Sequence, residues 1–184
     1  MSRRTPSPSR RLTLFGSIKR LVLCAMMVAM SVVIGTICKN YLNFADGLLR
    51  ITFENLPILL AGIFLGPVAG GMVGVTADLV SYLLSSQVYP PNPVVTLGAC
   101  AVGVVAGLMA KYVIKTRGIK QIILSSLAAH VVGSMIIKTL GLFAIYQWAV
   151  LIRVPVYLVI SSLEIILLCA LWQQRSFRQM LENL

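Results

Sequence analysis

Long stretches without a formal charge decide what this chain of 184 residues can fold into. The uncharged runs are residues 21–38, 55–77, 79–110 and 121–137. Each approaches or exceeds the ~18 apolar residues that an α-helix needs to cross a bilayer. The whole chain is 58% hydrophobic and only 11% charged, which leaves too little polar sequence to cover a soluble domain. The sequence therefore predicts an all-α protein that crosses a membrane several times.

Chain-breaking residues divide these runs into helices. Gly66-Pro67 predicts a tight turn, the VYPPNP segment at 88–93 breaks the next helix, and TRG at 116–118 makes a third turn. The result is one compact bundle of six transmembrane helices within a single domain over 16–184, preceded by a disordered basic tail over 1–15. The expected helices are 18–40, 51–65, 68–87, 93–115, 120–145 and 150–174. Helix 51–65 is too short to cross a ~30 Å hydrocarbon core alone, so its outer end should leave a depression that segment 39–50 covers.

The net charge of +11 is distributed as in a membrane protein. Basic residues gather before the first run, around 111–120 and at the end of the chain. An excess of Lys and Arg marks the cytoplasmic side, and six spans place both termini there together. The absence of a long soluble basic face argues against nucleic-acid binding.

Four basic residues remain for the opposite, outer half. They are Lys39, Arg50, Lys138 and Arg153. Each falls near the outer end of a predicted helix. One explanation is snorkelling, in which long cationic side chains reach the interface from a helix end. Four cations on the side that the charge rule depletes favour the other explanation, an outward-facing site for an anion.

Two acidic residues are candidates for that site. Asp78 should lie about 15 Å along its helix from Pro67, near the midplane, where a carboxylate costs about 3 kcal/mol and needs partners. A structural hydrogen bond to Thr76, Tyr82 or His130 is the alternative to a role in binding, which we favour. Glu54 falls in the first turn of helix 51–65, where helix capping and ligand contact are equally compatible with its position.

Other motifs favour packing over chemistry. His130, in mid-helix, is more typical of a satisfied core histidine than of a proton relay, and Glu164 lies in the inner half, where a structural or partner-facing role is expected. The four cysteines are isolated in apolar sequence, so no metal site is predicted. No phosphate-binding loop or nucleophile motif is present, so we expect neither an enzyme nor a cofactor.

Small residues recur at a spacing of four in two helices. Gly62, Gly66, Gly70 and Gly74 predict close packing of helices 51–65 and 68–87 into a hairpin. Ala25 and Ala29 form a similar step in the first helix, compatible with packing inside the bundle or with docking of a partner helix.

The segments ITFENLPILLAGIFLGPVAGGMVGVTADL and NPVVTLGA resemble the substrate-binding S components of energy-coupling factor (ECF) vitamin transporters, especially the folate-specific branch. The resemblance implies a six-helix protein of a prokaryotic cell membrane that binds a vitamin at its outer face. It also implies partners, namely a transmembrane coupling protein and two cytoplasmic ATPases that power delivery inward. Ala25 and Ala29 would then meet the coupling protein.

Folate suits several residues. Its pterin presents an amino group and a ring N–H side by side, and a carboxylate can accept both, with Asp78 the first choice and Glu54 the second. The remaining candidates divide by chemistry into aromatic side chains for stacking (Phe53, Tyr82, Trp148, Tyr157), cations for the glutamate tail (Arg50, Lys138, Arg153) and neutral hydrogen-bonding groups (Asn40, Asn92). The alternatives are biotin or pantothenate, which are also anionic, or riboflavin, with a small membrane enzyme more distant. Segments 39–50 and 86–93 would flank the mouth of the site.

Overall fold

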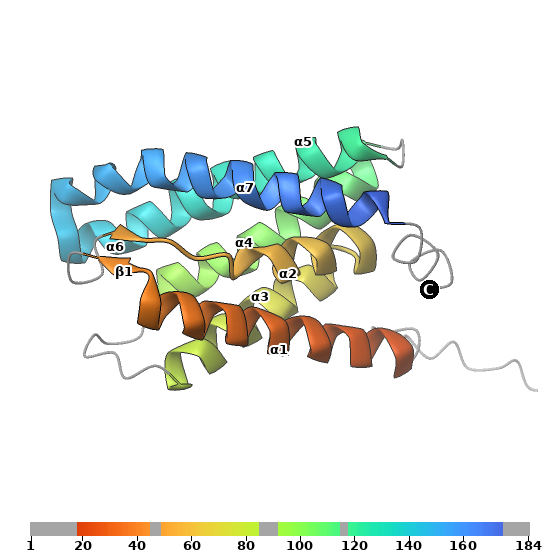
Figure 1. Ribbon diagram of the computed structural model, residues 1–184, viewed down its shortest axis with the longest axis horizontal. Coiled ribbons are helices and arrows are strands. Elements are labelled where there is room, and N and C mark those ends of the chain that lie inside the picture. The colour runs from red at the N-terminus through yellow and green to blue at the C-terminus, as the bar shows by residue number, and fades with distance from the viewer. Residues whose placement is uncertain (1–17, 45–48, 85–91, 115–117, 175–184) are drawn as a thin grey trace, which may run out of the picture.

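The computed structural model describes residues 18–44, 49–84, 92–114 and 118–174. These residues form a bundle of helices that run up and down past one another, and the first and last described residues lie at the same end of it (Figure 1). In chain order the elements are α1 (Ile18–Tyr41), β1 (Asn43–Phe44), β2 (Leu49–Arg50), α2 (Asn55–Leu60), η1 (Ala61–Leu65), α3 (Pro67–Leu84), α4 (Pro93–Leu108), η2 (Met109–Val113), α5 (Ile119–Ala129), η3 (His130–Lys138), α6 (Thr139–Tyr146), η4 (Gln147–Ile152) and α7 (Arg153–Gln173). The segments η1, η2 and η3 are π-helical, and η4 is a 3₁₀ helix.

The predicted all-helical fold is confirmed, and the described helices lie approximately where they were expected, but the second begins later than predicted. It starts at Asn55 because the preceding residues continue a short antiparallel hairpin, in which Asn43 lies opposite Arg50. The backbone N–H of Ile51 donates to the carbonyl of Leu42 at 3.2 Å and so extends this ladder. The expected cover over 39–50 therefore contains paired strands, whereas residues 45–48 and most of the other flanking segment, 85–91, lie outside the described residues.

Five of the described helical stretches are long and apolar enough to cross a membrane. They are Ile18–Cys38, Pro67–Leu84, Pro93–Val113, Ile119–Phe143 and Val150–Gln173. The sixth helix, Asn55–Leu65, is shorter, as predicted, and covers roughly half of a ~30 Å hydrocarbon core. Figure 1 shows α2 beginning in the middle of the bundle, so its first residues lie in the protein interior.

The glycine row predicted for a two-helix hairpin packs three helices together. A Cβ atom built on Gly70 would lie 2.5 Å from the Cα of Gly62 and 2.6 Å from the carbonyl oxygen of Gly103. One built on Gly62 would lie 2.4 Å from that same oxygen. The prediction missed Gly103, because nothing in the spacing of the earlier glycines indicates a partner in α4. Backbones of η1, α3 and α4 thus touch directly, which only glycine permits at this distance.

The turn before α3 needs glycine for a different reason. Gly66 has a φ of 106°, in a region of backbone conformation that residues other than glycine rarely adopt. Pro67 follows as the first residue of α3, where the missing N–H is not needed. This confirms the tight turn predicted from Gly66-Pro67.

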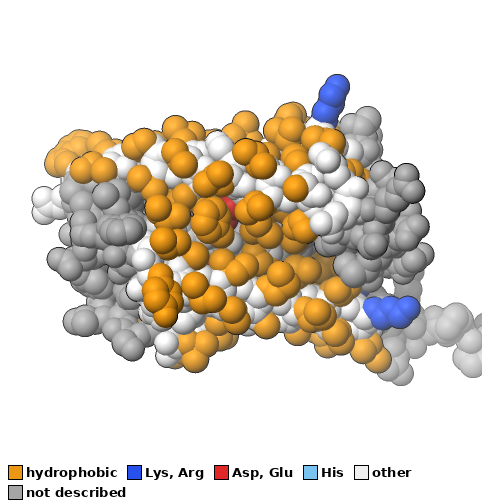
Figure 2. All heavy atoms as spheres, in the orientation of Figure 1, with side chains coloured by type: hydrophobic (Ala, Val, Ile, Leu, Met, Phe, Trp, Pro, Cys, Tyr) orange, Lys and Arg blue, Asp and Glu red, His pale blue; other side chains and the backbone are white. Residues whose placement is uncertain are grey.

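The outside of this bundle is apolar, whereas its interior combines a hydrophobic core with buried polar residues. Large hydrophobic side chains cover the outside, and Figure 2 shows them over most of the visible face, with Lys and Arg at the end where α1 begins. Buried positions include many polar residues, among them Ser31, Asn55, Ser81, Ser125, Ser126, His130, Ser134, Lys138, Ser161 and Glu164. Such a surface suits lipid, and ionisable groups inside such a bundle indicate a functional site.

Asn92, a predicted ligand contact, is the N-cap residue of α4. Its Oδ1 accepts from the N–H of Val94 at 3.0 Å, and its Nδ2 donates to the carbonyl of Gly141 at 2.5 Å. Asn92→Ala is therefore expected to destabilise the protein by about 1–2 kcal/mol and to lower the melting temperature by a few degrees. Asn92→Asp, which retains the capping acceptor, should lose less. A loss of ligand affinity for Asn92→Ala without a fall in melting temperature would support the predicted ligand contact and contradict the structural role.

Candidate functional site

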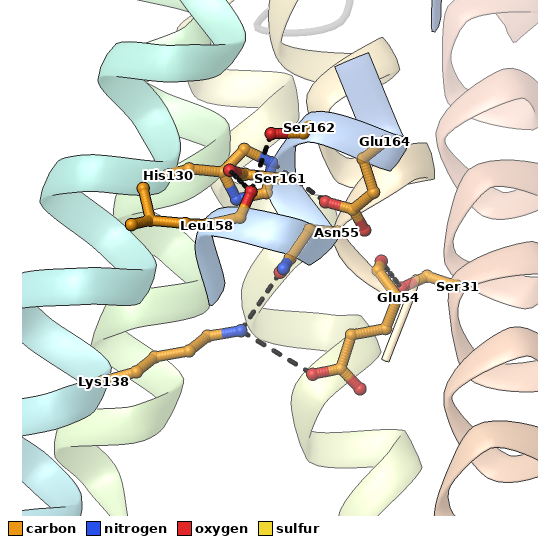
Figure 3. Close-up of polar contacts among 9 residues, drawn as sticks. All are labelled: Ser31, Glu54, Asn55, His130, Lys138, Leu158, Ser161, Ser162 and Glu164. Carbon is orange, nitrogen blue, oxygen red and sulfur yellow. Dashed lines mark hydrogen bonds and ion pairs between the residues drawn. The ribbon is translucent and has the colours of Figure 1, made fainter. Parts of the chain in front are cut away.

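Four polar residues meet inside the bundle where α2 begins, and we call Ser31, Glu54, Asn55 and Lys138 the Glu54–Lys138 cluster. The Nζ of Lys138, at the end of η3, donates to the Oδ1 of Asn55 at 3.1 Å and lies 3.6 Å from Oε1 of Glu54. The hydroxyl of Ser31, on α1, donates to the backbone carbonyl of Glu54 at 2.6 Å. Figure 3 shows these groups converging from three different helices. The cluster thus brings together Glu54 and Lys138, which the sequence proposed separately.

Burial makes this cluster electrostatically strong. Lys138 is only 6% exposed and Asn55 is buried, while the side chain of Glu54 is 15% exposed. An ammonium has three donors, and the 3.6 Å separation from Glu54 exceeds a good hydrogen-bond length. Lys138 can therefore donate to a further acceptor in a region of low dielectric constant, where such bonds are stronger than in water.

Glycines clear space beside both charged groups. A Cβ atom on Gly35 of α1 would lie 2.9 Å from Oε2 of Glu54 and 3.1 Å from the hydroxyl oxygen of Ser81. A Cβ atom on Gly98 of α4 would lie 2.5 Å from Cγ of Lys138. Larger residues at 35 or 98 would push the carboxylate or the ammonium out of place.

Asp78 lies on α3 and is half-buried. Its Oδ2 accepts a hydrogen bond from the hydroxyl of Thr96, on α4, at 2.7 Å. The sequence interpretation considered Thr76, Tyr82 and His130 as partners and did not consider Thr96, which is 18 residues away. Ser81, beside Glu54, is three residues further along α3 and shares the face of Asp78. The two carboxylates are thus held on neighbouring elements by different partners.

The other predicted ligand contacts are placed unequally. Phe53 precedes Glu54 and is half-buried, as are Tyr82 and Tyr157. Trp148 is 74% exposed and packs edge-on against Phe143, with ring centroids 5.6 Å apart, so it is directed away from the cluster. Asn40 is exposed at the end of α1. The side chains of Arg50 and Arg153 lie outside the described part of the structure.

The predicted docking residues of α1 are on the outside. Ala25 and Ala29 are both exposed, next to Met26 and Met30. Packing inside the bundle, one of the two sequence interpretations, is therefore wrong, because both side chains face away from the core. A small-residue strip among larger apolar side chains is compatible with the close approach of another helix.

A second polar pair lies on the other side of Asn55 and links η3 to α7. Nε2 of His130 is 2.9 Å from Oε2 of Glu164, and the two side chains are 2% and 0% exposed. The contact is not aligned as a straight hydrogen bond. The sequence indicated a core position for His130 and a structural or partner-facing role for Glu164, but it did not pair them, because no local pattern predicts that their helices touch. Figure 3 shows His130 and Lys138 on the same helix, both directed into the bundle.

Together, the apolar exterior, the spanning helices and the internal donor–acceptor cluster define a membrane-embedded binding protein. The model of the family "ECF transporter, substrate-specific component" matches residues 19–180. The chain belongs to this family.

Two relatives add detail. The riboflavin transporter RibU of Staphylococcus aureus (strain TCH60) is 30% identical over 129 residues, which are 69% of this chain and 65% of that protein, so the match spans slightly less than two thirds of the relative. The crystal structure of FolT bound with folic acid is similar with a TM-score of 0.61 at 24% identity, covering 85% of this chain and 90% of FolT. The similarity to FolT establishes the fold.

Proposed function

We propose that this chain is the folate-binding subunit of an ECF-type importer. The observation that carries the proposal is the pairing of the carboxylate of Glu54 with the ammonium of Lys138 in the bundle interior, 3.6 Å apart. One group accepts hydrogen bonds and the other donates them, and both are held by residues of surrounding helices. The fold shared with folate-bound FolT supports the same assignment.

The pterin ring of folate complements this pair. Its lactam edge carries two neighbouring N–H donors and, beside them, a carbonyl acceptor. The carboxylate of Glu54 can accept both donors, and Lys138 can donate to the carbonyl. Glu54 therefore replaces Asp78 as the first candidate for pterin recognition, because Asp78 has Thr96 rather than a cation beside its carboxylate.

Riboflavin is the second candidate because RibU is a relative at 30% identity. The imide edge of its ring has one N–H between two carbonyl groups. A carboxylate can accept from that N–H with one oxygen only, and its second oxygen would face a carbonyl oxygen. Lys138 could satisfy one carbonyl, but the carboxylate of Glu54 fits this edge less well than the pterin edge.

The rest of the vitamin would extend toward the hairpin end of the bundle. Phe53 and Tyr82 are proposed to pack on the flat rings near Glu54 and Asp78. Arg50 and Arg153, which begin or end elements at the same end as the hairpin, are proposed to meet the carboxylates of the glutamate tail. Tyr157 and Asn40 stay candidates for peripheral contacts.

Delivery inward would require a transmembrane coupling protein and two cytoplasmic ATPases. The exposed Ala25–Ala29 strip of α1 is proposed to meet the coupling protein. We place the chain in a prokaryotic cell membrane with both termini cytoplasmic, in line with the basic residues at the end where α1 begins (Figure 2). Residues 1–15 are proposed to form a tail outside the domain of 16–184.

Calorimetric titration of the purified, ligand-free protein in detergent tests the proposal, with folate, riboflavin, biotin and pantothenate compared at neutral pH. We expect tight one-to-one binding of folate and much weaker heats from the others. Tight binding of riboflavin in place of folate would assign the site to flavin and contradict the edge argument. Preference for biotin or pantothenate would mean that Lys138 binds the carboxylate of the vitamin, and it would contradict the proposed recognition of a pterin ring by Glu54. No binding by a folded, ligand-free protein would overturn the proposed function.

A further inference from the structure

The segment η3 has an unusual structure and carries charged chemistry at both of its ends. It is a nine-residue π-helical stretch that begins at His130 and ends at Lys138. π-Helical turns are rare, and they occur frequently at functional sites. The hydroxyl of Thr139, just beyond, is directed at the carbonyl of Ser134 five residues back, at 3.5 Å. The helix thus changes from π-helical to α-helical winding directly after Lys138, a residue of the Glu54–Lys138 cluster.

The first end of η3 is held by α7. His130 contacts Glu164 at 2.9 Å, and both side chains are almost completely buried. A buried carboxylate in a membrane bundle is costly, so its position is one at which a functional reason is expected. Neither His130 nor Glu164 belongs to the Glu54–Lys138 cluster, but His130 shares η3 with Lys138, so the pair can act on the cluster through this segment.

Winding connects the two ends. The angle between two side chains eight residues apart on a helix depends on the number of residues per turn, which is larger in a π-helix than in an α-helix. If the segment relaxed to α-helical winding, Lys138 would rotate about the helix axis relative to His130. The carbonyl of Gly133 and the Cγ of Lys138 both approach Gly98 of α4 closely, so the second half of η3 has little room to compensate.

We propose that His130 and Glu164 are positioning residues for Lys138: their contact fixes the start of η3 against α7, and the π-helical winding then presents the ammonium to Glu54 and to the ligand. This inference rests on the proposed function for its ligand, but the positioning itself is a property of the empty protein. It assigns a specific function to two residues for which the sequence indicated a core position (His130) and a structural or partner-facing role (Glu164).

A double-mutant cycle on folate affinity tests the proposal. Glu164→Gln should weaken binding at least about fivefold in the wild-type background and should add almost nothing in a Lys138→Met background, because the effect passes through the ammonium. The matched control is Ser161→Ala on the same helix, a buried group whose hydroxyl donates to the carbonyl of Leu158 at 3.0 Å. It should leave affinity unchanged. Full additivity of Glu164→Gln with Lys138→Met, or no loss of affinity, would overturn the proposal.

A second cycle needs no ligand and no Glu164 variant. The melting temperatures of Glu54→Gln, Lys138→Met and the double variant give the coupling between Glu54 and Lys138 in the empty protein. We expect that coupling to fall in a His130→Gln background. An unchanged coupling there would refute the positioning of Lys138, whatever vitamin the protein binds. Absence of folate binding combined with a reduced coupling would refute the proposed function and retain the positioning.

Discussion

Glu54→Gln is expected to weaken folate binding about a hundredfold, the range found when one member of a buried charged pair is removed. The amide of glutamine can accept with one atom only and presents a donor to the pterin amino group. It also leaves Lys138 without the anion that lies 3.6 Å away. Titration calorimetry on detergent-solubilised protein measures the change, with a thermal melt to show that the variant is folded.

Asp78→Asn is the variant to compare with Glu54→Gln, because it removes a carboxylate charge from the neighbouring helix α3. Thr96 holds Asp78 and no cation is described beside it, so we expect a loss of affinity well below that of Glu54→Gln. A larger effect of Asp78→Asn than of Glu54→Gln would show that the ranking from sequence was correct and that the structural ranking is wrong.

Gly103→Val is expected to be the most destabilising single change considered, at about 3 kcal/mol or more. The first carbon of any side chain there would lie 2.1 Å from the carbonyl oxygen of Gly70 and 2.2 Å from its carbonyl carbon. Backbone cannot move aside as a flexible side chain can, so α3 and α4 would have to separate. We expect the melting temperature to fall by about 10 °C. Size-exclusion chromatography after heating measures this change.

Gly118→Ala is the matched control for this change. Gly118 precedes α5, and among the described residues no atom beyond its chain neighbours lies within 4 Å of a Cβ built there. Its melting temperature should stay within about 2 °C of the wild type. An equal loss in both variants would mean that glycine matters through chain flexibility and not through the contact between α3 and α4.

The sequence predicted the helices well because their signals are local. Uncharged runs and the breaks at Gly66-Pro67 and before Pro93 lie in the chain itself, and the helix ends follow them within a few residues. The start of α2 was predicted four residues early, because the pairing of Ile51 with Leu42 is a contact between separate segments. The π-helical winding of η3 has no local sequence signal of the kind that marks a turn or a cap.

The sequence predicted which residues belong to the candidate site better than it predicted how those residues are arranged. Glu54 and Lys138 were each proposed, yet 84 residues separate them, and no spacing rule could show that they pair. Asp78 was ranked first from its depth along a helix, a quantity that ignores Thr96 on the next helix. Asn55 and Ser31 were not predicted to take part, although an isolated polar residue in an apolar run was the available signal for Ser31.

The direct backbone contact among η1, α3 and α4 has a mechanical consequence. Side chains in a packed interface can exchange rotamers and absorb small displacements, but Gly62, Gly70 and Gly103 have none to exchange. These three segments should therefore move as one stiff body. Any change of shape that accompanies loading is therefore expected in the segments around this contact, where side chains and not backbones make the packing between helices.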